Sequence, residues 1–250
     1  MKPAALRVNT LTYGYRAPLF EPLTFSCQKG EIWAVLGRNG LGKSTLLDTL
    51  TGTLPALDGS IEIDGGIGIV AQHCHLPFPY TVSDVVLMGR AQHVKLFAQP
   101  SNQDQLRATQ ALEQLNIAQL ASHSFSSLSG GQQQLVMIAR ALVTECQTLL
   151  LDEPCSALDL ANQQVVLQLI SDLAHLQGCS ILFSTNDPLH ALQIATHTLL
   201  LLPEGKWRAG PTDSIVTEEN LFQAYGLPLR KLRVENHPTP FIAPLFSVRR

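Results

Sequence analysis

The stretch IWAVLGRNGLGKSTLLDTL, residues 32–50, decides the fold of this chain. It opens with an almost unbroken apolar run that enters Gly37, which is typical of a strand buried on both faces. It ends with three leucines that fall on one face at helical spacing, at positions 46, 47 and 50. Between them, GRNGLGKS at 37–44 matches the pattern GxxxxGK(S/T) at the strand-to-helix position that this pattern requires. The stretch therefore predicts an α/β core with a phosphate-binding loop.

The residue types in this loop suit phosphate binding for physical reasons. Glycines let backbone amides curl round phosphate oxygens without side-chain clashes, and the start of the following helix adds a favourable dipole. We expect Lys43 to reach the β and γ phosphates, Ser44 to ligate Mg²⁺ through its hydroxyl, and Thr45 to add a hydrogen bond. On this loop alone a kinase, a GTPase and an ATPase all remain open. The nucleotide-binding candidates are the glycines and polar residues of the loop: Gly37, Asn39, Gly40, Gly42, Lys43, Ser44 and Thr45.

Two acids follow a second apolar run further along the chain. Asp152 and Glu153 come directly after the leucines at 149–151, so we expect them at the carboxyl end of a core strand. Phosphoryl transfer to water needs a carboxylate that holds the metal and a group that positions or deprotonates the water. Asp152 suits the first role and Glu153 the second. The alternative is an ordinary exposed acidic turn, because two buried neighbouring acids repel unless a metal and phosphate share the site.

Strand and helix patterns alternate over much of the chain. Residues 148–152 and 180–184 predict further strands, and apolar residues spaced by four and three predict a helix after Asp159. Strands that alternate with helices argue for a parallel α/β sheet, whose ligands lie beyond the carboxyl ends of the strands. Between residues 82 and 141 the strand patterns disappear, which predicts a mostly helical insertion.

Composition excludes several classes of protein. The 250 residues are 45% hydrophobic, and 17 Lys and Arg against 20 Asp and Glu give a net charge of −3. This apolar content excludes a disordered chain, and the lack of a basic excess predicts no nucleic-acid partner. Five cysteines without a CxxC pair make structural disulfides unexpected. The longest leucine run, at 199–202, is far below the ~18 residues that span a bilayer, so we expect no membrane span and no secretion.

Residues 128–132 read LSGGQ and carry a third motif. Together with the phosphate loop and the LLLDEP segment at 149–154, it resembles the signature of ABC-transporter ATP-binding subunits. We expect Ser129 and the amides of Gly130 and Gly131 to form a second anion cradle at a helix start, with Gln132 in the same nucleotide-binding set. In this family the cradle closes on the γ-phosphate held by a second copy. The resemblance therefore implies ATP and Mg²⁺ as cofactors and a head-to-tail dimer with two ATP molecules.

The resemblance covers residues 5–225 and implies roles for further residues. Tyr15 resembles the aromatic that stacks on adenine, although Tyr13 is a rival and a core position is open for either. Gln72 is similar to the Q-loop glutamine, which joins the shell of the Mg²⁺ or the water and senses the membrane partner. Asp159 ends a segment, 156–159, that resembles the D-loop at the dimer interface.

Asn186 departs from the family pattern, which normally has a switch histidine at this position. An Asn amide donates a hydrogen bond to a γ-phosphate oxygen, but it neither carries positive charge nor relays a proton. Slowed hydrolysis with preserved ATP binding is therefore one hypothesis, and the other is that Asn suffices in this protein. His190 lies one helical turn further on and is not expected to substitute.

The resemblance also implies an organisation of the chain. We expect an α/β fold: a P-loop NTPase core of the RecA-like type, formed by residues 1–90 and 147–226, with a mostly parallel sheet and an N-terminal antiparallel β part. A helical subdomain with the ABC signature is expected at 91–146. The tail, 227–250, contains four prolines, looks irregular and has no assigned role.

The segment TVSDVVLMGR at 81–90 resembles ATPases of importers for iron chelates, haem and cobalamin, and much of 60–165 looks closest to a molybdate and tungstate importer. The implied partners are a membrane permease and, indirectly, a periplasmic or surface substrate-binding protein, and the implied place is the cytoplasmic face of the inner membrane. Residues 73–80 suit a groove for a coupling helix or a plain surface loop. A metal site at 73–75 is disfavoured, because adjacent side chains seldom turn to one ion.

Two rival functions remain. One is a soluble ABC ATPase that works on nucleic acid or ribosomes. Such proteins commonly carry two cassettes or long coiled-coil insertions, and the sequence has neither pattern. The other is a nucleotide-gated binding module with impaired turnover, which Asn186 motivates and the intact Glu153 opposes.

Overall fold

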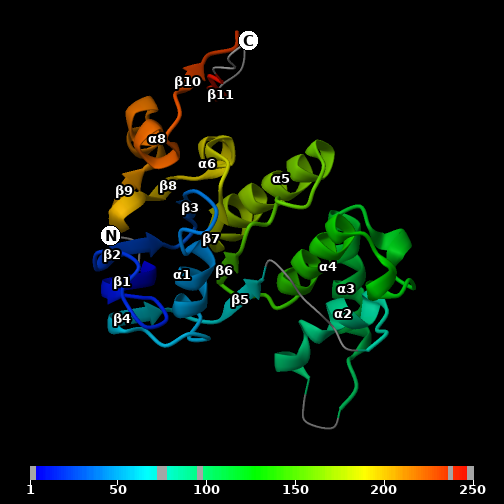
Figure 1. The fold of residues 1–250 in the computed structure, drawn as a ribbon. Coiled ribbons are helices and arrows are strands. Elements are labelled where there is room, and N and C mark those ends of the chain that lie inside the picture. The colour runs from blue at the N-terminus through cyan, green and yellow to red at the C-terminus, as the bar shows by residue number, and fades with distance from the viewer. Residues whose placement is uncertain (1–3, 72–77, 95–97, 236–238, 247–250) are drawn as a thin grey trace.

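The computed structural model describes residues 4–71, 78–94, 98–235 and 239–246 and has a six-stranded sheet at its centre (Figure 1). Its strand order is β5-β6-β7-β3-β8-β9, in which the first five strands are parallel and β9 runs antiparallel to β8. The predicted mostly parallel sheet is therefore confirmed. In spatial order the strands are β5 (Ile67–Val70), β6 (Thr148–Leu151), β7 (Ser180–Thr185), β3 (Ile32–Leu36), β8 (His197–Leu201) and β9 (Trp207–Pro211).

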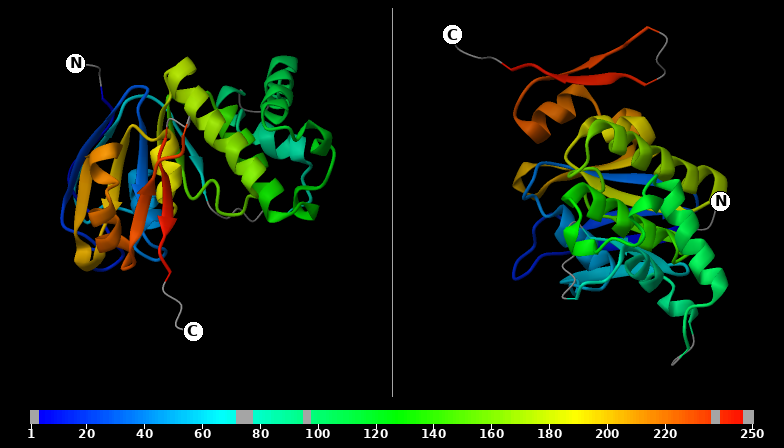
Figure 2. Two further views of the ribbon diagram at one scale, coloured as in Figure 1. Left: turned by 90° about the horizontal axis from the view of Figure 1, so that it is seen from above. Right: turned by 90° about the vertical axis from the view of Figure 1, so that its right-hand side faces the viewer.

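A three-stranded antiparallel sheet covers one face of the central sheet and confirms the expected N-terminal β part (Figure 2). It consists of β2 (Leu23–Gln28), β1 (Ala4–Thr12) and β4 (Asp58–Ile63), in that spatial order. Val8 of β1 lies opposite Phe25 of β2 and Ile61 of β4. These side chains share the inner face of the sheet, since apolar residues alternate with polar ones along β1.

The central sheet separates two hydrophobic clusters, and alternate residues of β3 face one or the other. Trp33 and Val35 belong to the cluster shared with the antiparallel sheet and with α1 (Lys43–Leu50). Ile32, Ala34 and Leu36 belong to the cluster on the opposite face. Burial on both faces explains why the sequence of this strand is a continuous apolar run and not an alternating one.

Helices α5 (Leu160–Gln177) and α6 (Pro188–Ile194) cover that opposite face. The helix predicted after Asp159 is confirmed: its apolar residues Val166, Ile170 and Leu173 are buried. Asp159 caps the helix by accepting a hydrogen bond from the Asn162 amide at 2.8 Å.

A separate helical part, on the right of Figure 1, contains α2 (Val82–Met88), α3 (Asn102–Gln114) and α4 (Gly130–Leu142). Short 3₁₀ turns connect these helices: η1 (Ala91–His93), η2 (Ala118–Leu120) and η3 (Phe125–Ser127). Because α2 packs against α3 and α4, we propose to begin the helical part before α2 and not at residue 91.

Arg90 ties the helical part together from inside. Only 5% of this residue is exposed. Its guanidinium donates to Asp104 Oδ1 at 2.8 Å, to the Val143 carbonyl at 2.7 Å and to Glu145 Oε2 at 2.9 Å, and Arg107 also pairs with Glu145. The end of α2, the start of α3 and the end of α4 are thus joined through one side chain.

The C-terminal residues contain regular structure, so the expectation of an irregular tail was wrong. After η4 (Pro203–Gly205), α7 (Thr212–Ile215) and α8 (Glu218–Tyr225), strands β10 (Leu229–Leu232) and β11 (Phe241–Pro244) pair as an antiparallel hairpin at one end of the molecule (Figures 1 and 2). Pro228, Pro240 and Pro244 lie just outside or at the ends of these strands, where a missing amide donor is tolerated.

Two further expectations concern spans and cysteines. None of the helices in the described ranges has the length and apolar character needed to cross a membrane. The four cysteines in those ranges, Cys27, Cys146, Cys155 and Cys179, carry free thiols.

Candidate nucleotide-binding site

The loop between β3 and α1 has the backbone shape that its glycines require. Gly40 and Gly42 have φ angles of 79° and 86°, a region that residues with a Cβ seldom adopt. A Cβ on Gly42 would also lie 2.7 Å from Leu19 Cδ1. Any larger residue at Gly42 would therefore strain the backbone and require the Leu19 side chain to move.

Lys43 crosses the inside of this loop. Its side chain is buried, and Nζ donates to the carbonyl oxygens of Gly37 at 2.9 Å and Arg38 at 3.2 Å. The same nitrogen lies 3.2 Å from Glu153 Oε1. The ammonium group is thus held inside the loop and paired with an acid from the end of β6.

The acid pair lies just after the carboxyl end of β6 and is not an ordinary exposed turn, since Asp152 is buried and Glu153 is mostly covered. Asp152 is 8% exposed, and the Ser184 hydroxyl donates to its Oδ1 at 2.5 Å. The Ser184 oxygen also accepts from the Glu153 amide at 2.8 Å. Glu153 has a φ of 46°, a left-handed conformation that is costly for a residue with a side chain and is often found at functional sites.

Ser184 is a site residue that the sequence reasoning missed. It is completely buried in β7, next to β6, and its hydroxyl contacts both members of the acid pair. Its signal in the sequence is weak: it is one of two hydroxyl residues at the end of the run SILFST. Its contacts with Asp152 and Glu153 arise only because β6 and β7 are neighbours in the sheet.

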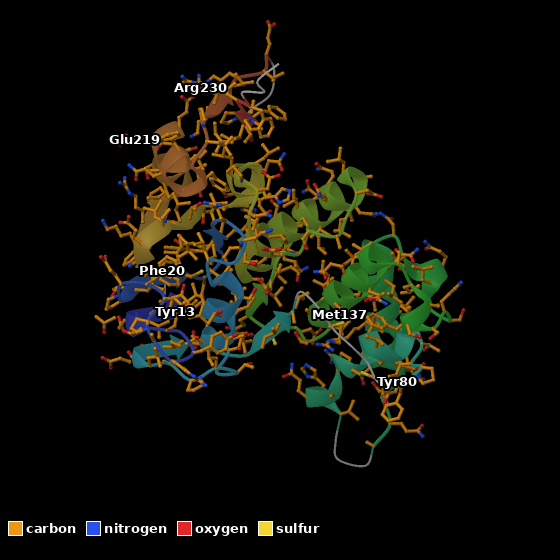
Figure 3. All side chains as sticks on the ribbon, viewed as in Figure 1. Tyr13, Phe20, Tyr80, Met137, Glu219 and Arg230 are labelled. Atoms are coloured by element: carbon orange, nitrogen blue, oxygen red, sulfur yellow. The ribbon has the colours of Figure 1, made fainter. Side chains whose placement is uncertain are left out.

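A cavity of about 420 Å³ lies over the phosphate loop. It is lined by residues of the loop and its flanks: Tyr15, Leu19, Asn39, Gly40, Gly42, Lys43, Ser44, Thr45 and Glu153. Tyr15 is 71% exposed at its rim. The rival Tyr13 is fully buried and stacks on Phe20 with ring centroids 5.9 Å apart, and burial raises the pKa of its phenol. Figure 3 marks the neighbouring positions of these two residues. Tyr13 is therefore a core residue.

Asn186 lies next to this cavity and contacts the phosphate loop. Its Nδ2 donates to Asn39 Oδ1 at 3.0 Å. A smaller cavity of about 160 Å³ is lined by Asn186, Glu153 and His190 among others. His190 is nearly buried, with Nδ1 3.3 Å from the Thr185 hydroxyl, and burial lowers the pKa of its imidazole although the Asp187 carboxylate opposes this shift.

The signature residues form the helix start that the sequence predicts. Ser129 caps α4: its hydroxyl accepts from the Gln132 amide at 3.4 Å, and Gln132 Oε1 accepts from the Ser129 amide at 3.1 Å. A Cβ on Gly131 would lie 2.9 Å from the Ala157 carbonyl, so the signature packs against the D-loop segment. Within the described part of the chain, no signature residue lines either cavity at the phosphate loop.

Asp159, like the signature residues, is not brought to the phosphate loop by the structure. Asp159 acts as the cap of α5 and lines neither of these cavities, judged on the described residues. Gln72 lies outside the described residues, as do positions 73–77 of the coupling-groove and metal hypotheses. Among the side chains that the structure describes, no three His, Cys, Asp or Glu residues gather as a ready metal site.

Comparison with known proteins identifies the family. The ABC transporter family model matches residues 20–156. The molybdate import ATP-binding protein MolC of Haemophilus influenzae is 49% identical over 90% of this chain and 89% of its own length. The ferric enterobactin transport ATP-binding protein FepC of Escherichia coli is 35% identical over 97% of this chain and 94% of its own length.

A solved structure agrees with these relatives. A metal-chelate type ABC transporter in an inward-facing conformation matches with a TM-score of 0.89 and 46% identity, over 97% of this chain and 98% of that chain. These matches confirm the resemblance that the phosphate loop, the LSGGQ motif and the acid pair indicated. The chain belongs to the ABC-transporter family, as one of its ATP-binding subunits that hydrolyse ATP.

Proposed function

We propose that this subunit binds ATP with Mg²⁺ at the phosphate loop and couples its hydrolysis to uptake of a molybdate-like oxyanion or a metal chelate. The observation that carries the proposal is that Lys43, Glu153 and Asp152 converge beyond the carboxyl ends of β3 and β6. Ser184 holds the two acids by hydrogen bonds. A cation, a candidate base and a candidate metal ligand thus surround the place where the γ-phosphate reacts.

The Mg²⁺ part rests on the chemistry of the donors. Ser44 and Asp152 offer hydroxyl and carboxylate oxygens, the ligand types that Mg²⁺ prefers, and the resemblance adds Gln72. The pKa of Asp48, one helical turn after Ser44, is raised by partial burial and by the nearby Asp152 carboxylate. A bound cation would relieve that excess of negative charge. When present, Mg²⁺ supplies charge neutralisation on the phosphate oxygens.

The residues then divide the chemistry among them. Tyr15 stacks on the base at the cavity rim, and Lys43 stabilises the negative charge of the β and γ phosphates. Glu153 accepts a hydrogen bond or a proton from the attacking water. Asn186 donates its amide to a γ-phosphate oxygen and contributes no charge, so transition-state stabilisation is weaker than a protonated histidine provides.

The placement of the motifs supports a head-to-tail dimer, which the family resemblance implies. Each chain has one phosphate loop and one LSGGQ segment, and they lie on different parts of the molecule (Figure 1). As in the family, the Ser129 cradle, with Gly130 and Gly131, closes on the phosphate held by a second copy. Asp159 lies in the segment that we place at this interface.

The partners and the cargo are inferred from the relatives. We propose that the dimer works at the cytoplasmic face of the inner membrane on a permease, which a substrate-binding protein serves in turn. The molybdate relative is 49% identical and the metal-chelate type transporter 46%, so these two relatives support both proposed classes of cargo.

ATP turnover by the purified chain tests the catalytic roles. Glu153→Gln should lower turnover by at least about a hundredfold and keep ATP binding, because general-base catalysis contributes that much. Asn186→His should raise turnover about fivefold, since a charged donor replaces a neutral one. Equal turnover of the parent and Asn186→His would mean that Asn suffices.

A second candidate is a nucleotide-gated binding module, which the neutral Asn186 side chain favours. In that case the parent and Asn186→His would both bind ATP without turnover, also when reconstituted with the permease. Copurification with a polytopic membrane protein separates the importer subunit from a soluble ABC ATPase.

A further inference from the structure

Tyr225, the last residue of α8, reaches the loop that carries Asn186. Its phenol donates to the backbone carbonyl of Asn186 at 2.8 Å. The two residues are 39 positions apart in the chain, so the contact is made only in the folded protein. Burial, and secondarily the Asp187 carboxylate, raises the pKa of the phenol. Tyr225 therefore remains a hydrogen-bond donor across the pH range in which the protein works.

Asn186 is held by two hydrogen bonds, one at its backbone and one at its side chain. The carbonyl of Asn186 accepts from Tyr225, and its side-chain amide donates to Asn39 of the phosphate loop at 3.0 Å. Rotation of the Asn186 peptide would break the first bond and turn the side chain away from the second. The orientation of the amide toward the phosphate cavity thus depends on the phenol behind it.

Helix α8 is a firm support for this phenol. Leu221 and Ala224 are completely buried, and Asn220 is nearly so. The Asn220 side chain donates to the Ile215 carbonyl at 2.8 Å and accepts from Arg208 at 2.7 Å. Gly226, with a φ of 72°, ends the helix directly after Tyr225. A residue at this helix end has little freedom to move on its own.

The C-terminal hairpin is attached to the same helix. At the first position of α8, Glu218 accepts from the Lys231 amide of β10 at 2.9 Å and pairs with Arg230. Strand β11 packs against α6, which begins just after the Asn186 loop. Helix α8 and the hairpin therefore border the loop that carries Asn186.

We propose that Tyr225 is a positioning residue for ATP hydrolysis, and that helix α8 influences the chemical step through the hydrogen bond from Tyr225 to Asn186. The inference rests on the proposed contact of the Asn186 amide with the γ-phosphate.

The test is a double-mutant cycle on the full chain with ATP turnover and nucleotide binding as readouts. Tyr225→Phe removes only the hydroxyl and should lower kcat about fivefold, as expected for loss of one hydrogen bond, with little change in the KM for ATP. Asn186→Ala should lower kcat as well. In the Asn186→Ala background, Tyr225→Phe should have no further effect, because no amide remains to be positioned.

Controls separate positioning from general structure. Glu219→Gln changes an exposed side chain of the same helix, leaves the phenol in place and should keep parental kcat. An equal fall of kcat for Tyr225→Phe with and without Asn186 would overturn the inference, as would parental kcat for Tyr225→Phe beside a reduced Asn186→Ala. Parental kcat for Asn186→Ala would instead overturn the proposed role of Asn186 at the phosphate.

Discussion

Ser184 shows how much one buried hydroxyl can determine. It bonds to the Asp152 carboxylate and to the Glu153 amide, so its removal leaves two buried polar groups without this partner. We expect Ser184→Ala to lower the free energy of unfolding by about 1–3 kcal/mol. Turnover should fall about tenfold, because both acids lose their positioning.

The control for Ser184 lies at the other end of the same strand. Ser180 is also buried and accepts from the Gly30 amide at 3.2 Å, away from the acid pair. Ser180→Ala should destabilise the fold to a similar degree and keep the kcat of the parent, as measured by denaturant unfolding and ATP turnover. Equal losses of turnover in both variants would refute a specific role of Ser184.

His190 makes stability depend on pH. Burial lowers the pKa of the folded imidazole below its unfolded value near 6.5, with Asp187 opposing the shift. Above about pH 6.5 the imidazole is neutral in both the folded and the unfolded chain, so His190 does not reduce the free energy of unfolding. As pH falls below about 6.5, the unfolded chain takes up the proton first, and the free energy of unfolding decreases.

Unfolding at pH 7.5 and pH 5.5 measures this effect. His190→Gln should lose less free energy of unfolding between the two pH values than the parent does. The groups around His190 are Thr185, Asp187, Glu153 and Cys155. An unchanged pH dependence in the variant would place the titration on other groups.

At the scale of elements, the hydrogen bonds of Arg90 predict where the helical part unfolds first. Arg90 and Asp104 are both nearly buried, and the hydrogen bonds from Ser101 and then Arg90 lower the pKa of Asp104. Arg90→Ala leaves the Asp104 carboxylate without its cation and should lower the free energy of unfolding, whereas Arg90→Lys should lower it less because it keeps the charge. Hydrogen exchange should rise first in α3 and α4. An equal rise of hydrogen exchange in the strands of the central sheet would contradict this prediction.

The elements also show what the sequence could predict. The strands β3, β6 and β7 and the helices α1 and α5 have strong local patterns, because burial on both faces gives continuous apolar runs and one-sided burial gives helical spacing. The hairpin of β10 and β11 was missed: LRKL and FIAP are four-residue strands with few buried side chains, so neither pattern develops. Ser184 and Tyr225 were missed because their partners come from other elements, which no local pattern reports.

At the scale of the whole molecule, the proposed dimer predicts an ATP-dependent change of mass. Glu153→Gln with ATP should sediment as a dimer of the 27.3 kDa chain and without ATP as a monomer, because slowed hydrolysis preserves the closed state. Adding Ser129→Glu should abolish the dimer and keep ATP binding, since a carboxylate in the anion cradle repels the phosphate of the partner. Persistence of the dimer in the double variant would argue for a different interface.

The pairing of Lys43 with Glu153 makes ATP binding a replacement reaction. Before the nucleotide arrives, the buried ammonium already has a carboxylate 3.2 Å away, so the phosphates compete with an internal anion for the same cation. Glu153→Gln removes that competitor. The Glu153→Gln variant should therefore hold ATP more tightly than the parent, and part of the intrinsic affinity for ATP is given up to keep the proposed base in place.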